Sequence, residues 1–472
     1  MFRHMKKGRS LRGSIGVSLV KILLFVGSFI IFFGFMGIKH PQLFRASRTA
    51  AITMTTFVIV TLCMIRIYGG FAIGRKRPRE IIISTMISML FTDLGTYFEL
   101  EIMNVNRYNH DFLQFGSVDV LLIVLMFQLV WVFLMTYLAH NIYFKYNPPE
   151  KCLLFLGKPE KEAEYLRRLS FRKKEFKVID ILPADAKHWH TALRDVQTIF
   201  LFDVPNERKA EIMDYAYKYH KDVYYTTELT DVVVNCSKHF LLDDISMLAS
   251  SFRGLTLEQR AVKRAMDLIV SSIGILIAGP IMLIEALAIK LGDGGPVFYK
   301  QERLTRDGET FHVIKFRTMR VDAEKGGKAQ LAKKDDDRIT PVGKILRKMR
   351  LDELPQLFNI FMGEMSLVGP RPERPSIAAE YYKDIPEFKF RLRAKAGLTG
   401  LAQIMGKYNT TPRDKLMLDL MYIERYSIWS DIMIIFQTLM VFFKSDSTEG
   451  FDQEENTEFE NEDAADGKDL TE

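Results

Sequence analysis

Two adjacent carboxylates, Asp352 and Glu353, open the segment RLDELPQLFNIFMGEMSLVGPRPERP, which runs from Arg350 to Pro375. Arg371 follows in the same segment, between two prolines that stiffen a GPRPE sequence. Carboxylates can act as acids, bases or nucleophiles, and a guanidinium fork matches phosphate oxygens two at a time. These residue types in this order predict chemistry on a phosphate or diphosphate group.

Further polar and basic side chains precede the carboxylate pair in two short segments. YKQER contributes Gln301 and Arg303, and VIKFRTM contributes Lys315 and Arg317. Arginine binds phosphate oxygens in pairs and lysine adds a point charge. Together with Arg371, these side chains are predicted to form a diphosphate cradle.

A structural role for the carboxylate pair is also open. Asp352 can be the N-cap of a helix predicted for LDELPQLFNIF, with Pro355 in the first turn, where N–H groups have no intrahelical partner. The same helix N-terminus would offer free N–H groups and a positive dipole end to a phosphate. Cap and nucleophile are therefore compatible, and the neighbouring cations favour the functional interpretation.

The block from about Gln259 to Lys444 closely resembles the bacterial sugar transferases, the monotopic polyprenyl-phosphate phosphoglycosyl transferases. The motifs that carry the resemblance are, in the family's order, KRAMDLIVSSIGILIAGP, GPVFYKQER, FHVIKFRTM, LDELPQLFNIFMGEMSLVGPRPE, AGLTGLAQIMGK and DLMYIERYSIWSDI. The order of segments in the whole chain is similar to that of the large, WbaP-like members. The sequence departs from the family at Thr305, where Gly is usual, and at Arg350, where a small residue is usual.

The resemblance implies transfer of a sugar-1-phosphate from a UDP-sugar to polyprenyl (undecaprenyl) phosphate, with release of UMP, as the first step of capsular, exopolysaccharide or other surface-glycan synthesis. It implies that Asp352 is the nucleophile of an aspartyl-phosphosugar intermediate and that Glu353 helps to hold Mg²⁺. The cations and the metal are expected to keep Asp352 ionised beside its acidic neighbour. The residues expected to bind the diphosphate are Arg303, Lys315, Arg317 and Arg371.

Several alternatives stay open at this point. Asp419, Tyr422 and Gln403 match family motifs, but a structural role suits them equally well. The donor sugar can be galactose, glucose or an N-acetylated sugar. The chain can instead be a non-catalytic membrane scaffold or regulator of a polysaccharide assembly complex, although the intact Asp352–Glu353 pair argues against this.

The N-terminal region predicts a membrane protein. Hydrophobic residues make up 48% of the sequence and come in long blocks. Four runs of about 20 apolar residues predict a four-helix transmembrane bundle within residues 1–145; they lie near Ile15–Ile38, Thr49–Ile67, Ile81–Leu100 and Val118–Ile142. The first run is long for a signal peptide and lacks a small-residue cleavage pattern, so it is interpreted as an uncleaved anchor.

Basic residues predict the orientation of the bundle. Five lie before the first run and five between the second and third, whereas the alternate connections hold three and one. The positive-inside rule therefore places both ends of the bundle in the cytoplasm and the catalytic domain on the cytoplasmic face of the bacterial inner membrane. Asp93, Glu99 and Glu101 would mark an ion path in a transporter, but their place near a helix end favours an interfacial role.

Residues 146–255 alternate short apolar runs with charged amphipathic ones, which predicts a cytoplasmic Rossmann-like domain with a parallel sheet. Its first strand-to-helix turn contains only Gly157, whereas a dinucleotide fingerprint needs several glycines. A spacer or oligomerisation domain is therefore favoured over a cofactor-binding one. His188 and His190 lack a carboxylate pattern and are interpreted as surface or packing residues. Cys63, Cys152 and Cys236 are isolated and indicate neither a disulfide framework nor a zinc site.

Residues 256–445 are predicted to form an α-rich catalytic domain that begins with a membrane-inserted helix. Gly279 and Pro280 interrupt its apolar run, and the resemblance implies a re-entrant helix with its break at Pro280; a kinked spanning helix is the alternative. Arg260, Lys263 and Arg264 are expected to face lipid headgroups.

The end of the chain gives three further expectations. The run IWSDIMIIFQTLMVFF is predicted to be an interfacial amphipathic helix because it contains Asp431 and Gln437. Residues 446–472 form an acidic tail, predicted to be disordered. The rest of the chain is basic, which suits membrane lipids and anionic substrates, and no nucleic-acid motif is present. A homodimer is the expected assembly on symmetry grounds.

Overall fold

The computed structural model describes residues 11–69, 72–74, 76–108, 115–250, 254–321, 323, 337–406 and 410–441. It consists of two compact units, Met1–Thr227 and Glu228–Glu472. The predicted boundary lay at residues 255/256, whereas the units divide at 227/228, so residues 228–250 group with the C-terminal unit. The predicted acidic tail, 446–472, lies outside the described residues.

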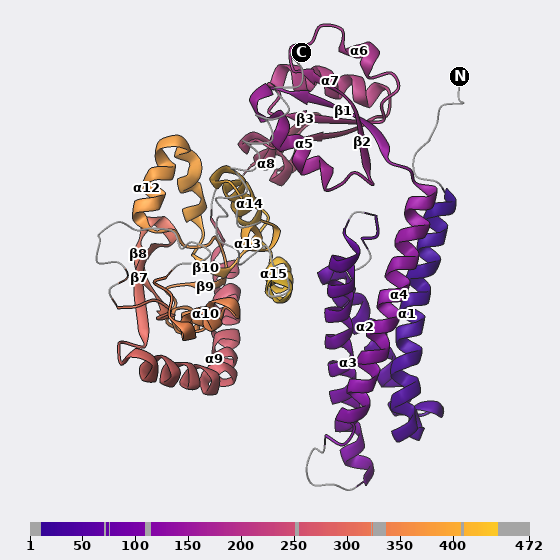
Figure 1. The fold of residues 1–472 in the computed structure, drawn as a ribbon, viewed down its shortest axis with the longest axis vertical. Helices are drawn as coiled ribbons and strands as arrows, with labels where there is room; N and C mark the ends of the chain where they lie inside the picture. The colour runs from indigo at the N-terminus through magenta and orange to yellow at the C-terminus, as the bar shows by residue number, and fades with distance from the viewer. Residues whose placement is uncertain are drawn as a thin grey trace, which may run out of the picture. The chain divides into compact units, whose positions relative to one another are not determined.

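Four long helices form the N-terminal part of the first unit (Figure 1). All four are long and apolar enough to cross a membrane, which confirms a helix at each predicted apolar run. Phe32, Phe57, Leu100 and Val124 pack together in the main apolar cluster between them. The four helices are α1 (Leu11–Lys39), α2 (Arg48–Tyr68), α3 (Pro78–Tyr108) and α4 (Val118–Tyr146).

A four-stranded sheet in the order β2-β1-β3-β4 completes the first unit, and its pairings are all parallel, which confirms the predicted parallel α/β sheet. The central strand β1 is buried along most of its length, as expected for a strand covered on both faces. The strands are β1 (Glu150–Leu156), β2 (Phe176–Pro183), β3 (Thr198–Phe202) and β4 (Asp222–Tyr225), and the helices between them are α5 (Glu162–Ser170), α6 (Trp189–Ala192) and α7 (Asn206–Lys218).

The first strand-to-helix turn of this sheet is closed by its own neighbours. Gly157 donates its N–H to the Phe202 carbonyl at 2.8 Å, and a Cβ at Gly157 would lie 1.8 Å from the Asp203 carbonyl oxygen. Tyr165 and Lys161 then contact the Asp203 carboxylate at 2.9 and 3.4 Å. Gly157 thus permits close packing of two strand ends, and this packing accounts for a glycine at this position without a bound pyrophosphate.

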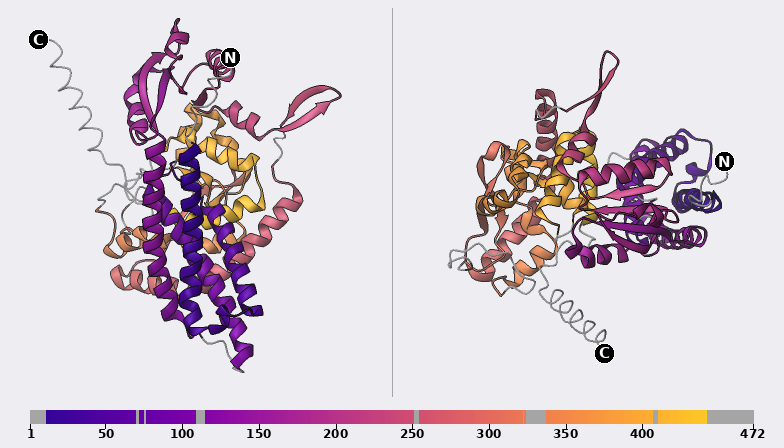
Figure 2. Two further views of the ribbon diagram at one scale, coloured as in Figure 1. Left: turned by 90° about the vertical axis from the view of Figure 1, so that its right-hand side faces the viewer. Right: turned by 90° about the horizontal axis from the view of Figure 1, so that it is seen from above.

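The C-terminal unit begins with α8 (Leu229–Cys236) and an antiparallel hairpin of β5 (Lys238–Leu242) and β6 (Ile245–Ala249). Val232 of α8 packs with Phe388 and Leu416, which explains why this segment belongs to the C-terminal unit. Every residue of the hairpin strands is exposed, and Figure 2 shows the hairpin extending away from the unit.

Helix α9 (Leu257–Asp293) is the long scaffold of the C-terminal unit. Thr256 caps its start in a capping box with Gln259, and Gly294 ends it in a left-handed conformation. The helix contains Pro280 and changes direction in Figure 1, as expected where proline removes a backbone hydrogen bond. The expected break is therefore a bend within one continuous helix.

Short elements pack against α9 and carry the predicted site. An antiparallel pair, β7 (Phe298–Leu304) and β8 (Thr310–Phe316), precedes the carboxylates, and a parallel pair, β9 (Ser366–Val368) and β10 (Gly397–Thr399), brackets the GPRPE segment. The helices are α10 (Pro341–Lys348), α11 (Gln356–Met362), α12 (Pro375–Asp384), α13 (Leu401–Met405), α14 (Pro412–Glu424) and α15 (Ile428–Val441); the 3-10 segments are η3 (Arg306–Gly308), η4 (Leu351–Glu353) and η5 (Pro386–Arg393).

Candidate active site

The carboxylate pair lies in η4, a single 3-10 turn between α10 and α11. Helix α11 starts only at Gln356, and Pro355 occupies its N-cap position. The interpretation of Asp352 as the cap of this helix is therefore wrong, because the 3-10 turn places it before the helix. Arg350 leads into the turn at φ +53°, a conformation that is uncommon for a residue with a side chain.

Glu353 is held by two cations from different elements. Lys315 of β8 donates to its Oε1 at 2.8 Å, and Arg371 donates to the same oxygen at 2.9 Å. The Lys315 and Glu353 side chains are 19% and 16% exposed, so water screens this pair only partly. The structure thus brings together three of the predicted site residues around one carboxylate oxygen.

Asn359 of α11 fixes the strand that carries Lys315. Its side-chain oxygen accepts the Ile314 N–H at 2.9 Å, and its amide nitrogen donates to the His312 carbonyl at 2.8 Å. Asn359 is fully buried and serves both backbone groups as a neighbouring strand would. This contact sets the position of β8 relative to α11, and hence of Lys315 relative to Glu353.

The two carboxylates have different electrostatic environments. Burial and the charge of Glu353 raise the pKa of Asp352, and Lys315, Arg347 and Arg371 oppose this only in part. Burial acts in the same direction on Glu353, but Lys315 and Arg371 outweigh it and hold the pKa of Glu353 well below its usual range. The cations were expected to keep Asp352 ionised; they act more strongly on Glu353.

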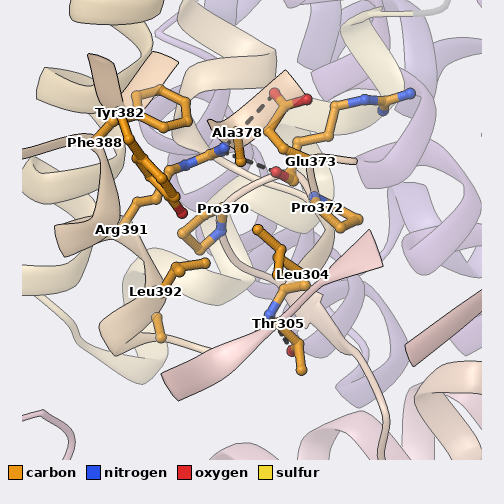
Figure 3. Close-up of a pocket in the computed structure, with 13 residues that line it drawn as sticks. Leu304, Thr305, Pro370, Pro372, Glu373, Ala378, Tyr382, Phe388, Arg391 and Leu392 are labelled. Carbon is orange, nitrogen blue, oxygen red and sulfur yellow. Dashed lines mark hydrogen bonds and ion pairs between the residues drawn. The ribbon is translucent and has the colours of Figure 1, made fainter. Parts of the chain in front are cut away.

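Arg371 is positioned through its backbone by a second arginine, Arg391, which is 4% exposed. Arg391 donates to the Arg371 carbonyl at 2.9 Å and pairs with Asp419 at 2.7 Å, while Glu373 lies 3.6 Å away. Figure 3 shows Arg391 reaching across to Glu373 beside Pro370 and Pro372. Asp419 therefore has a structural role here, and Arg391 is a positioning residue that sequence reasoning missed.

The cavity beside Arg391 holds little beyond a water molecule. Its interior measures about 10 Å³, close to the minimum for one water. Arg371, Thr305 and Tyr382 are among the residues that line it (Figure 3).

Arg303 and Thr305 hold the GPRPE segment from the side of β7. Arg303 donates to the Pro372 carbonyl at 3.0 Å, and burial together with the nearby charge of Arg371 lowers its pKa to about 10. Thr305 accepts the Ala396 N–H at 3.2 Å. The departure from the family pattern at Thr305 thus adds a hydrogen bond between the hairpin and the start of β10.

Arg317 lies outside this group. Its guanidinium pairs with both oxygens of Asp293, one of them at 2.7 Å, and its Nε donates to the Pro296 carbonyl at 2.7 Å. The side chain is 7% exposed. The predicted role of Arg317 in diphosphate binding is not supported by these contacts, because they anchor the end of α9 to the end of β8.

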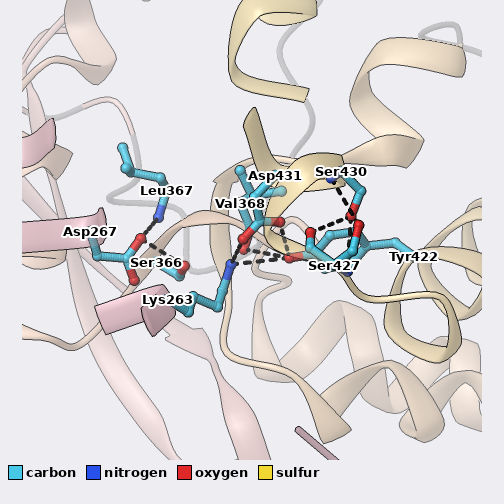
Figure 4. Close-up of polar contacts among 9 residues, drawn as sticks. All are labelled: Lys263, Asp267, Ser366, Leu367, Val368, Tyr422, Ser427, Ser430 and Asp431. Carbon is cyan, nitrogen blue, oxygen red and sulfur yellow. Dashed lines mark hydrogen bonds and ion pairs between the residues drawn. The ribbon is translucent and has the colours of Figure 1, made fainter. Parts of the chain in front are cut away.

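A buried polar cluster joins α9 to α14 and α15 (Figure 4). Lys263 pairs with Asp431 at 2.6 Å and donates to the Tyr422 hydroxyl at 3.1 Å, and Tyr422 donates to Asp431 at 2.7 Å. Asp431 is fully buried. Two expectations are thereby corrected: Lys263 does not face headgroups, and Asp431 does not form the polar face of an interfacial helix, because each neutralises the other inside the unit.

Two more α9 side chains fix the strand and helix next to the site. Asp267 accepts the Leu367 N–H at 2.9 Å and the Ser366 hydroxyl at 3.0 Å (Figure 4). Arg264 donates to the carbonyls of Ile360 and Phe361, each at 2.7 Å, and so satisfies the C-terminal end of α11. Arg264 thus has a structural role at the end of α11, which the sequence did not show.

Glu285 of α9 is an acidic residue that the sequence analysis passed over. It is 5% exposed, and among the described residues neither carboxylate oxygen has a hydrogen-bond partner. Its charge interacts with that of Asp352. The signal in the sequence was one acid within an apolar helical run, three residues after Met282 and four before Ile289, both of which are buried.

The acidic side chains near η4 can supply part of the ligand set of a Mg²⁺ ion, but they do not form a complete metal site made of protein ligands alone. Within the described ranges, no three His, Cys, Asp or Glu side chains converge as a ligand set. Mg²⁺ usually takes one or two carboxylates and fills its other positions with water and substrate phosphates. The oxygens of Glu285 have no hydrogen-bond partner among the described residues, and its charge interacts with that of Asp352, so these carboxylates fit such an ion.

Comparison with known proteins identifies the family of the chain. The profile of the bacterial sugar transferase family matches residues 258–445, which include the whole site and all of α9 except its first residue. The chain is 39% identical over 190 residues to the UDP-glucose:undecaprenyl-phosphate glucose-1-phosphate transferase of Caulobacter vibrioides, covering 39% of this chain and 71% of that protein. It is 37% identical over 191 residues to the exopolysaccharide production protein ExoY of Rhizobium meliloti, covering 38% and 83%. The chain belongs to the bacterial sugar transferase family.

A longer relative shares only part of its length. The chain is 40% identical over 181 residues to the UDP-N-acetylgalactosamine-undecaprenyl-phosphate N-acetylgalactosaminephosphotransferase of Aeromonas hydrophila, covering 38% of this chain and 43% of that protein. The match thus spans less than half of that relative.

Proposed function

We propose that this protein transfers a sugar-1-phosphate from a UDP-sugar to undecaprenyl phosphate, releases UMP and starts the synthesis of a surface glycan. The observation that carries the proposal is the pair Asp352 and Glu353 in a family-matched region, with Lys315 and Arg371 converging on Glu353. Two of the relatives are named as undecaprenyl-phosphate sugar phosphotransferases, which supports the same reaction class.

In the proposed mechanism a carboxylate oxygen of Asp352 attacks the phosphorus that bears the sugar. The bond between that phosphorus and the bridging oxygen of UMP breaks, UMP leaves with the electron pair, and an aspartyl-phosphosugar forms. An oxygen of the lipid phosphate then attacks the same phosphorus, and Asp352 leaves as a free carboxylate. The reaction thus proceeds in two displacement steps, with UMP and then Asp352 as the leaving group, in place of a direct attack of one anionic substrate on the other.

The other side chains position this reaction. Arg371 and Lys315 lie beside the dyad, where their charges offset charge on the phosphoryl oxygens. Glu353 holds both cations in place and is the proposed carboxylate ligand of Mg²⁺. When bound, Mg²⁺ would supply further positive charge to the diphosphate of the donor.

Membrane placement forms the second part of the proposal. We infer a multi-pass protein of the bacterial inner membrane, with a four-helix bundle and a cytoplasmic catalytic domain, from the distribution of basic residues. Helix α9 is proposed to enter one leaflet and return at the bend around Pro280. Such a helix holds the site at the membrane surface, where a soluble donor and a lipid acceptor can meet. A homodimer is proposed on symmetry grounds.

The test is UMP release by the full-length protein in a lipid bilayer with undecaprenyl phosphate, Mg²⁺ and a panel of UDP-sugars, run beside Asp352→Asn. Lipid-dependent release with one sugar, abolished by the substitution, is the expected result and identifies the donor. If no UDP-sugar gives lipid-dependent UMP, the transferase proposal fails and a scaffold function replaces it.

A further inference from the structure

Glu285 is a buried acidic residue whose contacts within the fold do not explain it. A carboxylate that is removed from water without a hydrogen bond or a counter-charge costs several kcal/mol. Among the described residues, neither oxygen of Glu285 accepts a hydrogen bond, although the residue is only 5% exposed. Asp267, elsewhere on the same helix, shows the usual solution, since its carboxylate accepts two hydrogen bonds from β9.

The side of α9 that carries Glu285 packs against the turn that holds the dyad. Met282 and Ile289, one turn to either side of Glu285, belong to a cluster with Leu346 of α10. Leu351 and Leu354, which flank Asp352 and Glu353 in the chain, pack on the same cluster. The carboxylate of Glu285 therefore lies on the helix face that meets η4, near enough for its charge to act on Asp352.

The negative charge of Glu353 is neutralised, in contrast to that of Glu285. Glu353 is already neutralised by hydrogen bonds from Lys315 and Arg371. Neither oxygen of Glu285 has a hydrogen-bond partner among the described residues, and its charge repels that of Asp352. A small cation bound between them would offset both charges.

We propose that Glu285 is a positioning carboxylate of the divalent-cation site, binding the hydrated ion from the α9 side while Asp352 and Glu353 face it from η4. The described side chains do not form a closed three-ligand cage, so Glu285 acts through waters of the ion, which Mg²⁺ retains readily. Outer-shell partners of this kind typically change metal affinity by about 10- to 100-fold. The inference rests on the proposed cation dependence of the transferase.

The experiment measures Mn²⁺ binding to the full-length protein in lipid nanodiscs, by the loss of the free Mn²⁺ resonance in electron paramagnetic resonance and without any substrate. Glu285→Gln is compared with Glu285→Asp and with Glu258→Gln, an exposed acid on the same helix. We expect Glu285→Gln to weaken Mn²⁺ binding by about 10- to 100-fold. Glu285→Asp is expected to retain most of the affinity, and Glu258→Gln all of it.

Thermal unfolding of each variant shows whether it is folded, and a second readout uses activity. The Mg²⁺ concentration for half-maximal UMP release should rise in Glu285→Gln, with kcat at saturating Mg²⁺ nearly unchanged. Equal Mn²⁺ affinity of wild type and Glu285→Gln, or no Mn²⁺ binding by wild type, overturns the inference. If wild type and Glu285→Gln bind Mn²⁺ equally and UMP is released normally, the Glu285 inference fails and the transferase proposal stands. If Glu285→Gln weakens Mn²⁺ binding but wild type releases no UMP, the transferase proposal fails and the Glu285 inference stands.

Discussion

Replacing Lys315 with Met tests the arrangement around Glu353, because Arg317, two residues further along the chain, supplies a matched comparison. Lys315 donates to Glu353 at 2.8 Å between two largely buried side chains. A hydrogen bond to a charged group contributes about 1.5–3 kcal/mol. If all of it acts in the transition state, kcat should fall about 10- to 150-fold.

Arg317→Lys keeps the charge at the second position but gives up the paired hydrogen bonds to Asp293. Since those contacts anchor α9, this variant should lower the unfolding temperature and leave kcat within about threefold of wild type, a change of less than 1 kcal/mol. The assay is the initial rate of UMP release at saturating UDP-sugar and Mg²⁺ in a bilayer. If folded Arg317→Lys loses as much activity as Lys315→Met, or if Lys315→Met is unimpaired, the assignment of roles is refuted.

Three further predictions follow from the site and its supports. Burial and the acidic neighbour raise the pKa of Asp352, so the ionised nucleophile is lost as pH falls through that pKa. The acid limb of the kcat/KM profile should therefore lie above the usual range of Asp pKa values. An acid limb within that range would contradict the raised pKa. Asp419→Leu removes one partner of the buried Arg391–Asp419 pair and should destabilise the unit by about 3–5 kcal/mol. The double variant Arg391→Met/Asp419→Leu should recover part of this loss. An unchanged unfolding temperature of Asp419→Leu would disprove the pairing. In a variant without native cysteines, a cysteine at Gln259 or at Leu291 should react with an impermeant maleimide from the same side of the membrane, and labelling from opposite sides would show that α9 spans it.

The elements of this protein were largely predictable, because they rest on local patterns. Apolar runs of about 20 residues gave the four N-terminal helices, and alternating apolar and amphipathic segments gave the parallel sheet. The motifs grouped Lys315 and Arg371 with the carboxylates as a diphosphate cradle, but they did not show that both side chains donate to Glu353.

Pairings over long sequence distances were not predictable. Lys263 and Asp431 are 168 residues apart, and nothing local in either segment shows that each neutralises the other. Arg317 lies just after the end of β8, where strand alternation no longer fixes the side of a residue, so its partner Asp293 could not be inferred. Glu285 was visible as one acid on an apolar helix face, but only the fold brings that face to η4.

The account depends most on Asp352 as the nucleophile. The direct measurement is the intact mass of the bilayer-reconstituted protein, rapidly quenched after incubation with its UDP-sugar and Mg²⁺ but without lipid acceptor. The account predicts an added mass of one sugar-phosphate on the peptide that contains Asp352, its disappearance when undecaprenyl phosphate is supplied, and its absence in Asp352→Asn. Lipid-dependent turnover without any such adduct, or turnover that persists in Asp352→Asn, would contradict it.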